Sequence, residues 1–195
     1  MVAGYLEKSI LLIGDSHAEH LATPLIKIAN KSEFNFYLYR SKFIDKETIS
    51  KFLIQNPNTV IVYSQYSNLD TDFNSLMSDL NFLSHISTKV IIFGQTPAYT
   101  DERLFMNGGS IATAWYKPKK VLPINHLNIS SWNAGLKLKE YALNGKMSFI
   151  DPTESLCDKF SCWRFKDGKW LYFDDDHLSI YGANLFESDF LKYIK

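Results

Sequence analysis

The chain has 195 residues and a mass of 22.5 kDa, which is enough for one compact domain, and we expect residues 1–195 to form a single one. With 46% hydrophobic and 22% charged residues, it is neither disordered, nor collagen-like, nor a coiled coil. The net charge is zero, and the only basic cluster is Lys117, Lys119 and Lys120, so nucleic acid is not an expected partner.

No apolar run approaches the ~20 residues that a membrane-spanning helix needs. The longest run near the start, residues 10–13, is also too short for the core of a signal peptide. We therefore expect the chain as given neither to span a membrane nor to carry its own export signal.

Short apolar, β-branched runs alternate with segments of helical spacing along most of the chain. In chain order, the predicted elements are strand Ser9–Ile13, helix Ala18–Asn30, strand Phe34–Tyr39, helix Asp45–Gln55, strand Thr59–Tyr63, helix Thr71–Ile86, strand Lys89–Phe93, helix Ser130–Leu143, strand Met147–Ile150 and helix Ser179–Tyr193. This alternation predicts an α/β fold, a three-layer α/β/α sandwich around a mostly parallel five-stranded sheet. The strands are apolar on both faces, as a sheet covered on both sides requires.

The segment 95–123 has no clear period and is long for a connection inside a compact domain, which favours a functional loop. It contains Tyr99, Trp115 and Tyr116, which could stack on a sugar ring or line an acyl pocket.

The first predicted strand ends directly in Gly14-Asp15-Ser16-His17. Ligands of open α/β sheets bind at the carboxyl ends of the strands, and a helix N-terminus favours an anion. Ser16 is therefore placed as a nucleophile whose attack creates an oxyanion beside it. The alternative is that Ser16 only caps the following helix.

A second motif, Asp174-Asp175-Asp176-His177, precedes the last predicted helix. A serine nucleophile needs a base, and a histidine base needs a carboxylate to fix its tautomer. Asp174 can fold back within one turn to reach the ring of His177, whereas Asp175 and Asp176 are less well placed but remain open. The alternative is an acidic loop with a histidine at the surface.

The two cysteines, Cys157 and Cys162, are either unrelated reduced thiols or a short-loop disulfide that indicates an oxidising compartment. His17 and His20 could share a helix face, but no third ligand has a suitable spacing, so we predict no metal site.

Taken together, ILLIGDSHAEHL and FDDDHLSIYGA resemble the first and last motif blocks of the SGNH hydrolases, also called GDSL-like esterases. The sequence is closer still to the SGNH domains fused to membrane acyltransferases that O-acetylate bacterial surface glycans, on the strength of GDSHAEHLATPL, LCDKFSC and LYFDDDHLSIYGANLF. The resemblance implies a flavodoxin-like α/β/α fold with Ser16 as the nucleophile, His177 as the base and Asp174 as its orienting acid.

The wider superfamily takes oxyanion donors from a glycine after strand two and an asparagine after strand three. Here no glycine lies between Gly14 and Gly94, and strand three is followed by 64–68, without the Gly-x-Asn-Asp pattern. We expect the Ser16 backbone N–H to serve as one donor and Gln65 or Asn68 to supply a side-chain donor, with His17 shaping the pocket.

The resemblance implies serine-dependent transfer of an acyl group, acetyl above all, to a glycan acceptor, without a cofactor. It also implies a periplasmic or other extracytoplasmic domain, a disulfide between Cys157 and Cys162, and a membrane acyltransferase domain in the same or a partner chain. One alternative is an esterase of the same fold. Another is a non-catalytic glycan-binding module, for which the missing oxyanion blocks would mark lost activity. A flavodoxin-like nucleotide-binding domain is disfavoured, because GDSHAEH lacks a phosphate-binding glycine pattern.

Overall fold

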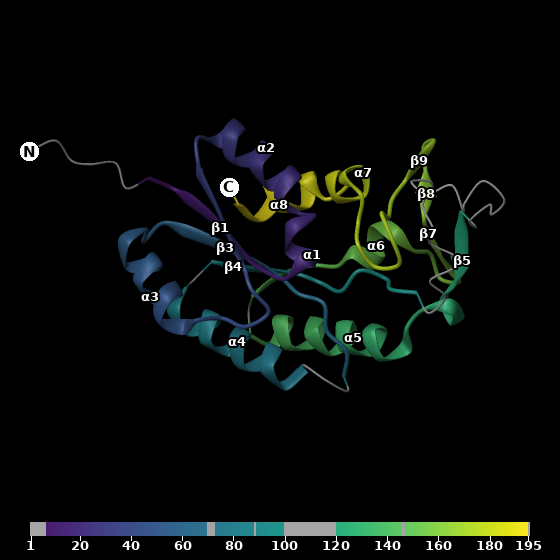
Figure 1. The fold of residues 1–195 in the computed structure, drawn as a ribbon, viewed down its shortest axis with the longest axis horizontal. Coiled ribbons are helices and arrows are strands. Elements are labelled where there is room, and N and C mark those ends of the chain that lie inside the picture. The colour runs from purple at the N-terminus through teal and green to yellow at the C-terminus, as the bar shows by residue number, and fades with distance from the viewer. Residues whose placement is uncertain (1–6, 70–72, 88, 100–119, 146, 195) are drawn as a thin grey trace, which may run out of the picture.

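A five-stranded sheet forms the centre of the protein (Figure 1). The structure is a computed structural model, and it describes residues 7–69, 73–87, 89–99, 120–145 and 147–194. The strands lie in the order β2-β1-β3-β4-β6, and every neighbouring pair is parallel. They are β1 (Ser9–Gly14), β2 (Asn35–Arg40), β3 (Thr59–Ser64), β4 (Val90–Phe93) and β6 (Ser148–Ile150). The predicted α/β fold is confirmed, and the central sheet is parallel throughout.

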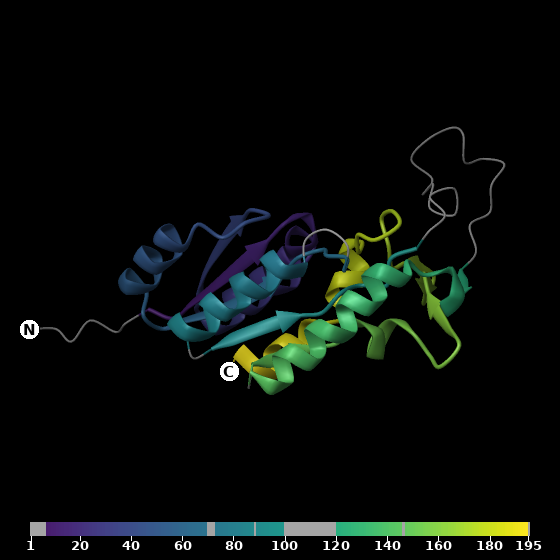
Figure 2. The same cartoon turned by 90° about the horizontal axis from the view of Figure 1, so that it is seen from below.

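Helices cover both faces of this sheet (Figures 1 and 2). In Figure 1, α2 (Ala22–Ser32), α7 (Ile180–Asn184) and α8 (Glu187–Ile194) lie above the strands. The helices below them are α3 (Lys46–Gln55), α4 (Phe73–Ile86) and α5 (Ile129–Asn144), and Figure 2 shows the teal α4 and green α5 crossing in front of the sheet. These are the three layers that the alternating pattern predicts.

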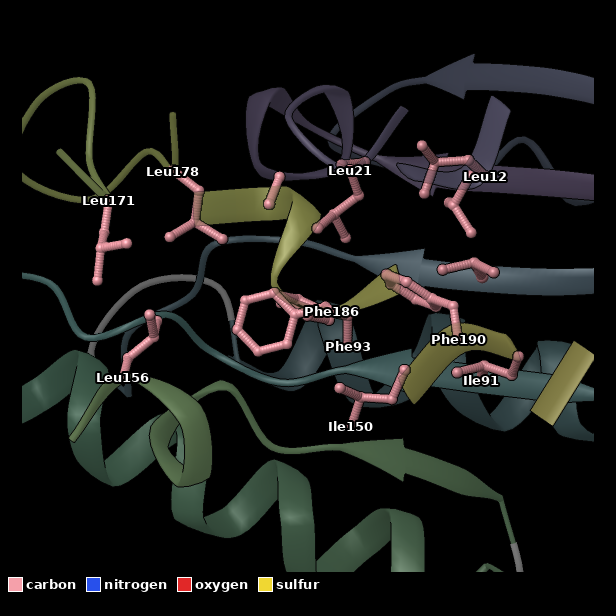
Figure 3. Packing of buried hydrophobic residues seen from close by; sticks show 14 of the residues in the cluster. Leu12, Leu21, Ile91, Phe93, Ile150, Leu156, Leu171, Leu178, Phe186 and Phe190 are labelled. Carbon is pink, nitrogen blue, oxygen red and sulfur yellow. The ribbon is translucent and has the colours of Figure 1, made fainter. Parts of the chain in front are cut away.

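Alternate residues of β1 enter two separate hydrophobic clusters. Ile10 and Leu12 pack with α2, α7 and α8, whereas Leu11 and Ile13 pack with α3, α4 and α5. Figure 3 shows the first cluster, in which Phe186 and Phe190 lie against Phe93 of β4. Burial on both faces explains why β1, β3 and β4 are almost uninterrupted apolar runs.

The edge strand β2 departs from the expectation that every strand is buried on both faces. Its residues are half-buried or exposed, and Leu38 is among the exposed apolar side chains. β2 pairs with β1 on one side only, because it stands at the end of the sheet. Apolar composition did not distinguish this edge strand from a central one.

Two predicted helices are each divided in two. The first is α1 (Ser16–Glu19) followed by α2, with Leu21 N–H donating to Ala18 O at the junction. The last is α7 followed by α8, and Phe186 N–H donates to Ala183 O between them. Such short i→i+3 bonds tighten and end a helix. Pro24 lies in the first turn of α2, where proline is tolerated, so it is a sequence signal for the first of these breaks.

Small additional elements come after β4 in the sequence, some before β6 and some after it, and Figure 1 shows their short strands at the right-hand end of the molecule. They are β5 (Val121–Pro123), η3 (Ile124–His126), α6 (Pro152–Leu156), β7 (Ser161–Trp163), β8 (Phe165–Lys166) and β9 (Lys169–Trp170). β5 pairs with β7 and β8 pairs with β9, both antiparallel. Sequence analysis predicted none of these six elements.

Cys157 and Cys162 form a disulfide across a tight turn, with their Cα atoms 3.9 Å apart. Asp158 fastens the same turn, because its carboxylate accepts from the N–H groups of Phe160 and Ser161. The alternative of two unrelated thiols is therefore wrong. In the described part of the chain, no helix combines the length and the apolar character needed to cross a bilayer.

Candidate active site

Ser16 lies where β1 ends, as its place in the sequence predicts. It is the first residue of α1, and the N-cap of that helix is Asp15, whose carboxylate accepts from His17 N–H at 2.9 Å. The other carboxylate oxygen of Asp15 accepts from Tyr66 N–H at 3.2 Å, which ties this turn to the segment after β3. The interpretation of Ser16 as the capping residue is therefore wrong. Asp15 does the capping, and the Ser16 hydroxyl is left for another partner.

Gly14 makes this exit from the sheet possible. Its φ of +149° is one that residues with a side chain rarely adopt, and a Cβ added there would lie 1.6 Å from the carbonyl oxygen of Ser64. Gly14 is opposite Ser64 in the parallel register of β1 and β3. Glycine therefore lets the Ser16 turn pass directly beside the end of β3.

His177 reaches the same turn from the far end of the chain. Its Nε2 lies 2.7 Å from Oγ of Ser16. The segment that carries it precedes α7, where Gly182 packs so closely that an added Cβ would lie 2.0 Å from Leu171 O. Thus the two motifs, 161 residues apart in the sequence, meet at hydrogen-bond distance, as a serine nucleophile and its base require.

Two carboxylates lie beside the other ring nitrogen of His177. The oxygens of Asp174 are 2.9 and 3.0 Å from Nδ1, and the same carboxylate accepts from His177 N–H at 2.8 Å. Oδ1 of Asp176 lies 2.7 Å from Nδ1 as an ion-pair contact. The three-residue spacing thus places Asp174 where we expected it. We expected Asp176 to be less well placed than Asp174 to reach the ring of His177, and this expectation is wrong.

These carboxylates favour the protonated form of His177. The pKa of His177 is raised to about 9, chiefly by Asp176 and further by Asp174, against an opposing effect of burial. The pKa of Asp176 is lowered, because its hydrogen bonds and charge attraction to His17 and His177 outweigh the effect of its burial. His177 is therefore imidazolium at neutral pH, and it becomes a free base as the pH approaches 9.

His17 belongs to the same group of side chains. It is 5% exposed, its Nε2 lies 3.4 Å from Oδ2 of Asp176, and its ring centroid is 4.5 Å from that of His177. Its ring also packs against Tyr66, at 5.1 Å between centroids. We predicted that His17 shapes the pocket; the structure places it behind the candidate base, in contact with Asp176.

Thr96 is a contributor that sequence reasoning left without a role. Its hydroxyl donates to Asp176 O at 2.9 Å, and Oγ1 lies 3.5 Å from Nδ1 of His17. The preceding residue, Gln95, accepts from Ser67 N–H at 3.1 Å. Residues that follow β4 therefore hold both the His177 segment and the loop after β3. The signal available in the sequence was that Gln95 and Thr96 are two polar residues just after a buried strand, although the sequence does not show which residues they contact.

His20 holds the segment that carries His177 through a hydrogen bond to its backbone. Its Nδ1 accepts from Leu178 N–H at 2.9 Å, so the ring is neutral with its proton on Nε2. Burial first, and then the neighbouring imidazoles of His17 and His177, lower the pKa of His20 well below its usual value. His20 therefore positions the residue that follows His177 and does not act as a second base.

The predicted oxyanion donors remain predictions. Ser16 begins α1, so its backbone N–H has no acceptor within the helix. Gln65 is buried, and its Oε1 is 2.6 Å from the Tyr63 hydroxyl, which donates to it. That leaves the amide Nε2 as the group of Gln65 that could donate. Asn68 is half-buried on the same loop.

Of the three aromatic residues suggested for a sugar or acyl pocket, only Tyr99 lies within the described residues. Tyr99 is 3% exposed and packs edge-on against Tyr172 in the core, which removes it as a ligand platform. Trp115 and Tyr116 lie outside the described residues. Tyr66, which we did not predict, is half-buried, contacts His17 and is fixed through its backbone to Asp15.

Two groups of side chains in the described part of the chain have the spacing of a metal site. Ligand atoms of His17, Asp176 and His177 lie within 4.8 Å of one another, and so do those of Asp174, Asp175 and Asp176. The imidazoles of the first group already pair with the Asp176 carboxylate at 3.4 and 2.7 Å. Mutual pairing accounts for this arrangement, so we interpret it as a hydrogen-bonded network.

A large cavity in the described part of the protein lies away from Ser16. It has a volume of about 870 Å³ and opens beside the starts of β1, β3 and β4, with Lys8, Thr59 and Lys89 in its lining. Ser16 lies at the opposite ends of these strands. This cavity therefore lies at the opposite end of the strands from the candidate site.

Comparison with known families gives one match that covers almost the whole chain. The model of the "SGNH domain (fused to AT3 domains)" matches residues 3–192. No curated protein sequence matches significantly.

Similar solved structures include two acetyltransferase domains. The periplasmic domain of a lipopolysaccharide acetyltransferase from Salmonella ser. Paratyphi A is 15% identical, with a TM-score of 0.70, over 97% of this chain and 84% of that one. The C-terminal catalytic domain of a peptidoglycan O-acetyltransferase from Streptococcus pneumoniae, with a methylsulfonyl adduct, is 14% identical, with a TM-score of 0.49, over 96% and 93%. The first similarity shows a shared fold.

Proposed function

Because this chain belongs to the family of SGNH domains fused to AT3 domains, we propose that it transfers an acetyl group to a hydroxyl of a bacterial surface glycan through an acyl-enzyme on Ser16. The observation that supports this most strongly is the 2.7 Å contact between Oγ of Ser16 and Nε2 of His177, with the Asp174 carboxylate at Nδ1. The substrate class follows the name of the Salmonella domain with the same fold.

In the acylation step, Ser16 Oγ attacks the acyl carbonyl carbon while Nε2 of His177 takes the hydroxyl proton. The Asp174 carboxylate stabilises the imidazolium that forms and keeps the remaining proton on Nδ1. The tetrahedral intermediate then collapses, the bond to the leaving group breaks, and that group departs with the proton from Nε2.

In the second step, an acceptor hydroxyl gives its proton to Nε2 of His177 and attacks the acyl-Ser16 carbonyl. The ester bond to Ser16 breaks, Ser16 Oγ regains the proton, and the acylated acceptor leaves. In both intermediates, the oxyanion forms beside the start of α1, where the backbone N–H of Ser16 can donate to it. Every proton and bond is accounted for by protein side chains and the two substrates.

Hydrolysis is the competing outcome, and one observation favours it. The side chains of His177 and Asp174 are 29% and 37% exposed, so water can reach the base. Water in place of the glycan hydroxyl makes the same chain an esterase of carbohydrate or lipid esters. Transfer requires that the acceptor occupy this opening and exclude water from the acyl-enzyme.

The proposed setting is extracytoplasmic, with a membrane acyltransferase domain in the same or a partner chain as the source of acetyl groups. The family is defined by fusion to such domains. The Cys157–Cys162 disulfide supports the setting, because disulfides persist in oxidising compartments. The Salmonella domain with the same fold is also named as periplasmic.

The test is mass spectrometry of the chain after incubation with p-nitrophenyl acetate, with and without oligosaccharides from bacterial surface glycans. We expect one added acetyl group on the peptide that contains Ser16. We further expect the glycan to remove it faster than buffer alone and to become acetylated.

Ser16→Ala is the matched control and should carry no acetyl group on that peptide. Acetyl-Ser16 that is lost to water at the same rate with every glycan would indicate the esterase. A folded protein that binds glycan but never acquires an acetyl group would contradict the enzyme and favour the non-catalytic binding module.

A further inference from the structure

Two carboxylates lie at Nδ1 of His177, although this nitrogen has only one proton to donate. Asp174 lies at 2.9 Å and Asp176 at 2.7 Å from the same nitrogen. One N–H can align well with one acceptor, and Asp174 also accepts from the backbone N–H of His177. Asp174 is thus sufficient to orient the ring. Asp176 therefore adds a second negative charge at a base that is already oriented.

Asp176 is held more firmly than a loop carboxylate would be. Its side chain is 19% exposed, against 37% for Asp174, and its backbone carbonyl accepts from the Thr96 hydroxyl. Its second oxygen lies 3.4 Å from Nε2 of His17. The Asp176 carboxylate thus contacts two imidazoles. Attraction of this carboxylate to His17 therefore weakens the effect of its charge on the pKa of His177.

The titratable groups around His177 come from three parts of the chain. Asp174, Asp175 and Asp176 come from its own segment, His17 and His20 from the α1 region and Tyr66 from the loop after β3. His20 is neutral, because its Nδ1 accepts from Leu178 N–H. The site therefore has one carboxylate, Asp176, in contact with the imidazoles of both His17 and His177.

We propose that Asp176 is a positioning residue that sets the proton affinity of His177, and that His17 limits this effect by competing for the same carboxylate. The inference rests on the proposed function, in which His177 is the base. It assigns to Asp176 a task distinct from that of Asp174. Asp174 fixes the tautomer, whereas Asp176 determines the pH above which the base is free.

The direction of the shifts follows from charge. An opposite charge within ~4–6 Å changes a pKa by about 1–3 units, so Asp176→Asn should lower the pKa of His177 by at least about one unit. Consistent with this, Asp176 is the largest cause of the raised pKa of His177. His17→Phe keeps a ring in the contact with Tyr66 and removes the competitor, so it should shift the pKa of His177 upward.

The experiment measures His177 in two independent ways, in the wild-type chain, Asp176→Asn, His17→Phe and Asp174→Asn. The first is an NMR titration of the imidazole in a Ser16→Ala background, which needs no activity. The second is the pH dependence of kcat/KM for p-nitrophenyl acetate in the active chain. Asp189→Asn on α8 is the control for removal of a carboxylate elsewhere.

For Asp176→Asn, we expect the titration and the acidic limb of kcat/KM to move to lower pH together, with a plateau within about tenfold of wild type. Asp174→Asn should lose about 10²-fold or more at the plateau, because the tautomer is no longer fixed. Asp176→Glu should restore most of the shift. These outcomes separate the roles of the two carboxylates.

If the pKa of His177 in folded Asp176→Asn equals that of the wild-type chain, the proposal is overturned. It is also overturned if the plateau of kcat/KM falls while its acidic limb stays at the same pH, because that result indicates a structural role only. A downward shift in His17→Phe would overturn the competition. If no chain hydrolyses ester but the titrations shift as expected, the proposed function fails and the electrostatic assignment stands.

Discussion

At the residue scale, the site depends on which atoms hold the proton between Ser16 and His177. With the pKa of His177 at about 9, Nε2 donates to Ser16 Oγ at neutral pH. When His177 loses its proton, the direction reverses, and the Ser16 hydroxyl donates to Nε2. The attack by Ser16 that we propose can begin only from the second arrangement. We therefore expect activity to rise with pH across the range in which His177 titrates.

Stability should follow the opposite trend. The pKa of His177 is raised from 6.5 in the unfolded chain to about 9 in the fold, so its pairing stabilises the fold fully below pH 6.5. That contribution is lost as the pH rises through about 9. The measurement is Tm against pH for the wild-type chain and His177→Gln. The Tm advantage of wild type should shrink between these two pH values, and an advantage that grows there would contradict the raised pKa.

The sequence predicted the residues that carry a motif and missed those that act across the fold. Ser16, Asp174 and His177 could be identified because each lies within a short motif with a chemical reason for its spacing. Thr96 and Tyr66 contact the site from loops 80 and 51 residues away from their partners. Nothing local marks such residues, because their role depends on which strands are neighbours.

At the element scale, the ends of β1 and β3 carry the site. Their register places Gly14 beside Ser64, and the turns that follow are joined through Asp15 and Tyr66. The strands were predictable, because burial on both faces leaves a continuous apolar run. The break between α7 and α8 was not predictable, because no proline lies at it. The break between α1 and α2 did have a signal that was not used, because Pro24 lies in the first turn of α2, where proline is tolerated, and not in the interior of a longer helix.

Gly14→Ala tests this junction. The new methyl group would meet Ser64 O at a φ that alanine avoids, so we expect a loss of about 2 kcal/mol or more in the free energy of unfolding, together with most of the activity. Gly168→Ala is the matched control, since Gly168 also has a positive φ but has no neighbour within 4 Å of an added Cβ. Urea unfolding of both variants makes the comparison. Equal losses would show that backbone conformation, and not the close approach of the strands, is what requires glycine.

At the scale of the whole molecule, the sheet brings together two ends of a chain that are 161 residues apart at the site. Layer order and strand direction followed from the alternation of elements. The short ladders β5–β7 and β8–β9 did not, because strands of two or three residues leave too short a pattern to detect. The Cys157–Cys162 disulfide lies in this additional region, where it joins the C-cap residue of α6 to β7.

The disulfide should matter for stability and not for catalysis. It closes a loop of five-residue separation, so its contribution should fall below the ~3 kcal/mol expected for a loop of 15 residues. Cys157→Ser with Cys162→Ser should therefore lower the free energy of unfolding by about 2 kcal/mol or less and leave ester hydrolysis within about twofold. Intact mass under non-reducing conditions should show the wild-type chain lighter by two hydrogens than its reduced form. Free thiols in protein secreted to an oxidising compartment would remove this support for the proposed location.

The central claim is that Ser16 is made nucleophilic by His177, and a fluorophosphonate probe tests it most directly because it reacts with an activated serine whatever the natural substrate. Peptide mapping should place the probe on Ser16 in the wild-type chain, with labelling abolished in Ser16→Ala and strongly slowed in His177→Ala. A folded wild-type chain that stays unlabelled at pH values above the His177 titration, or one that is labelled equally well without His177, would contradict the account.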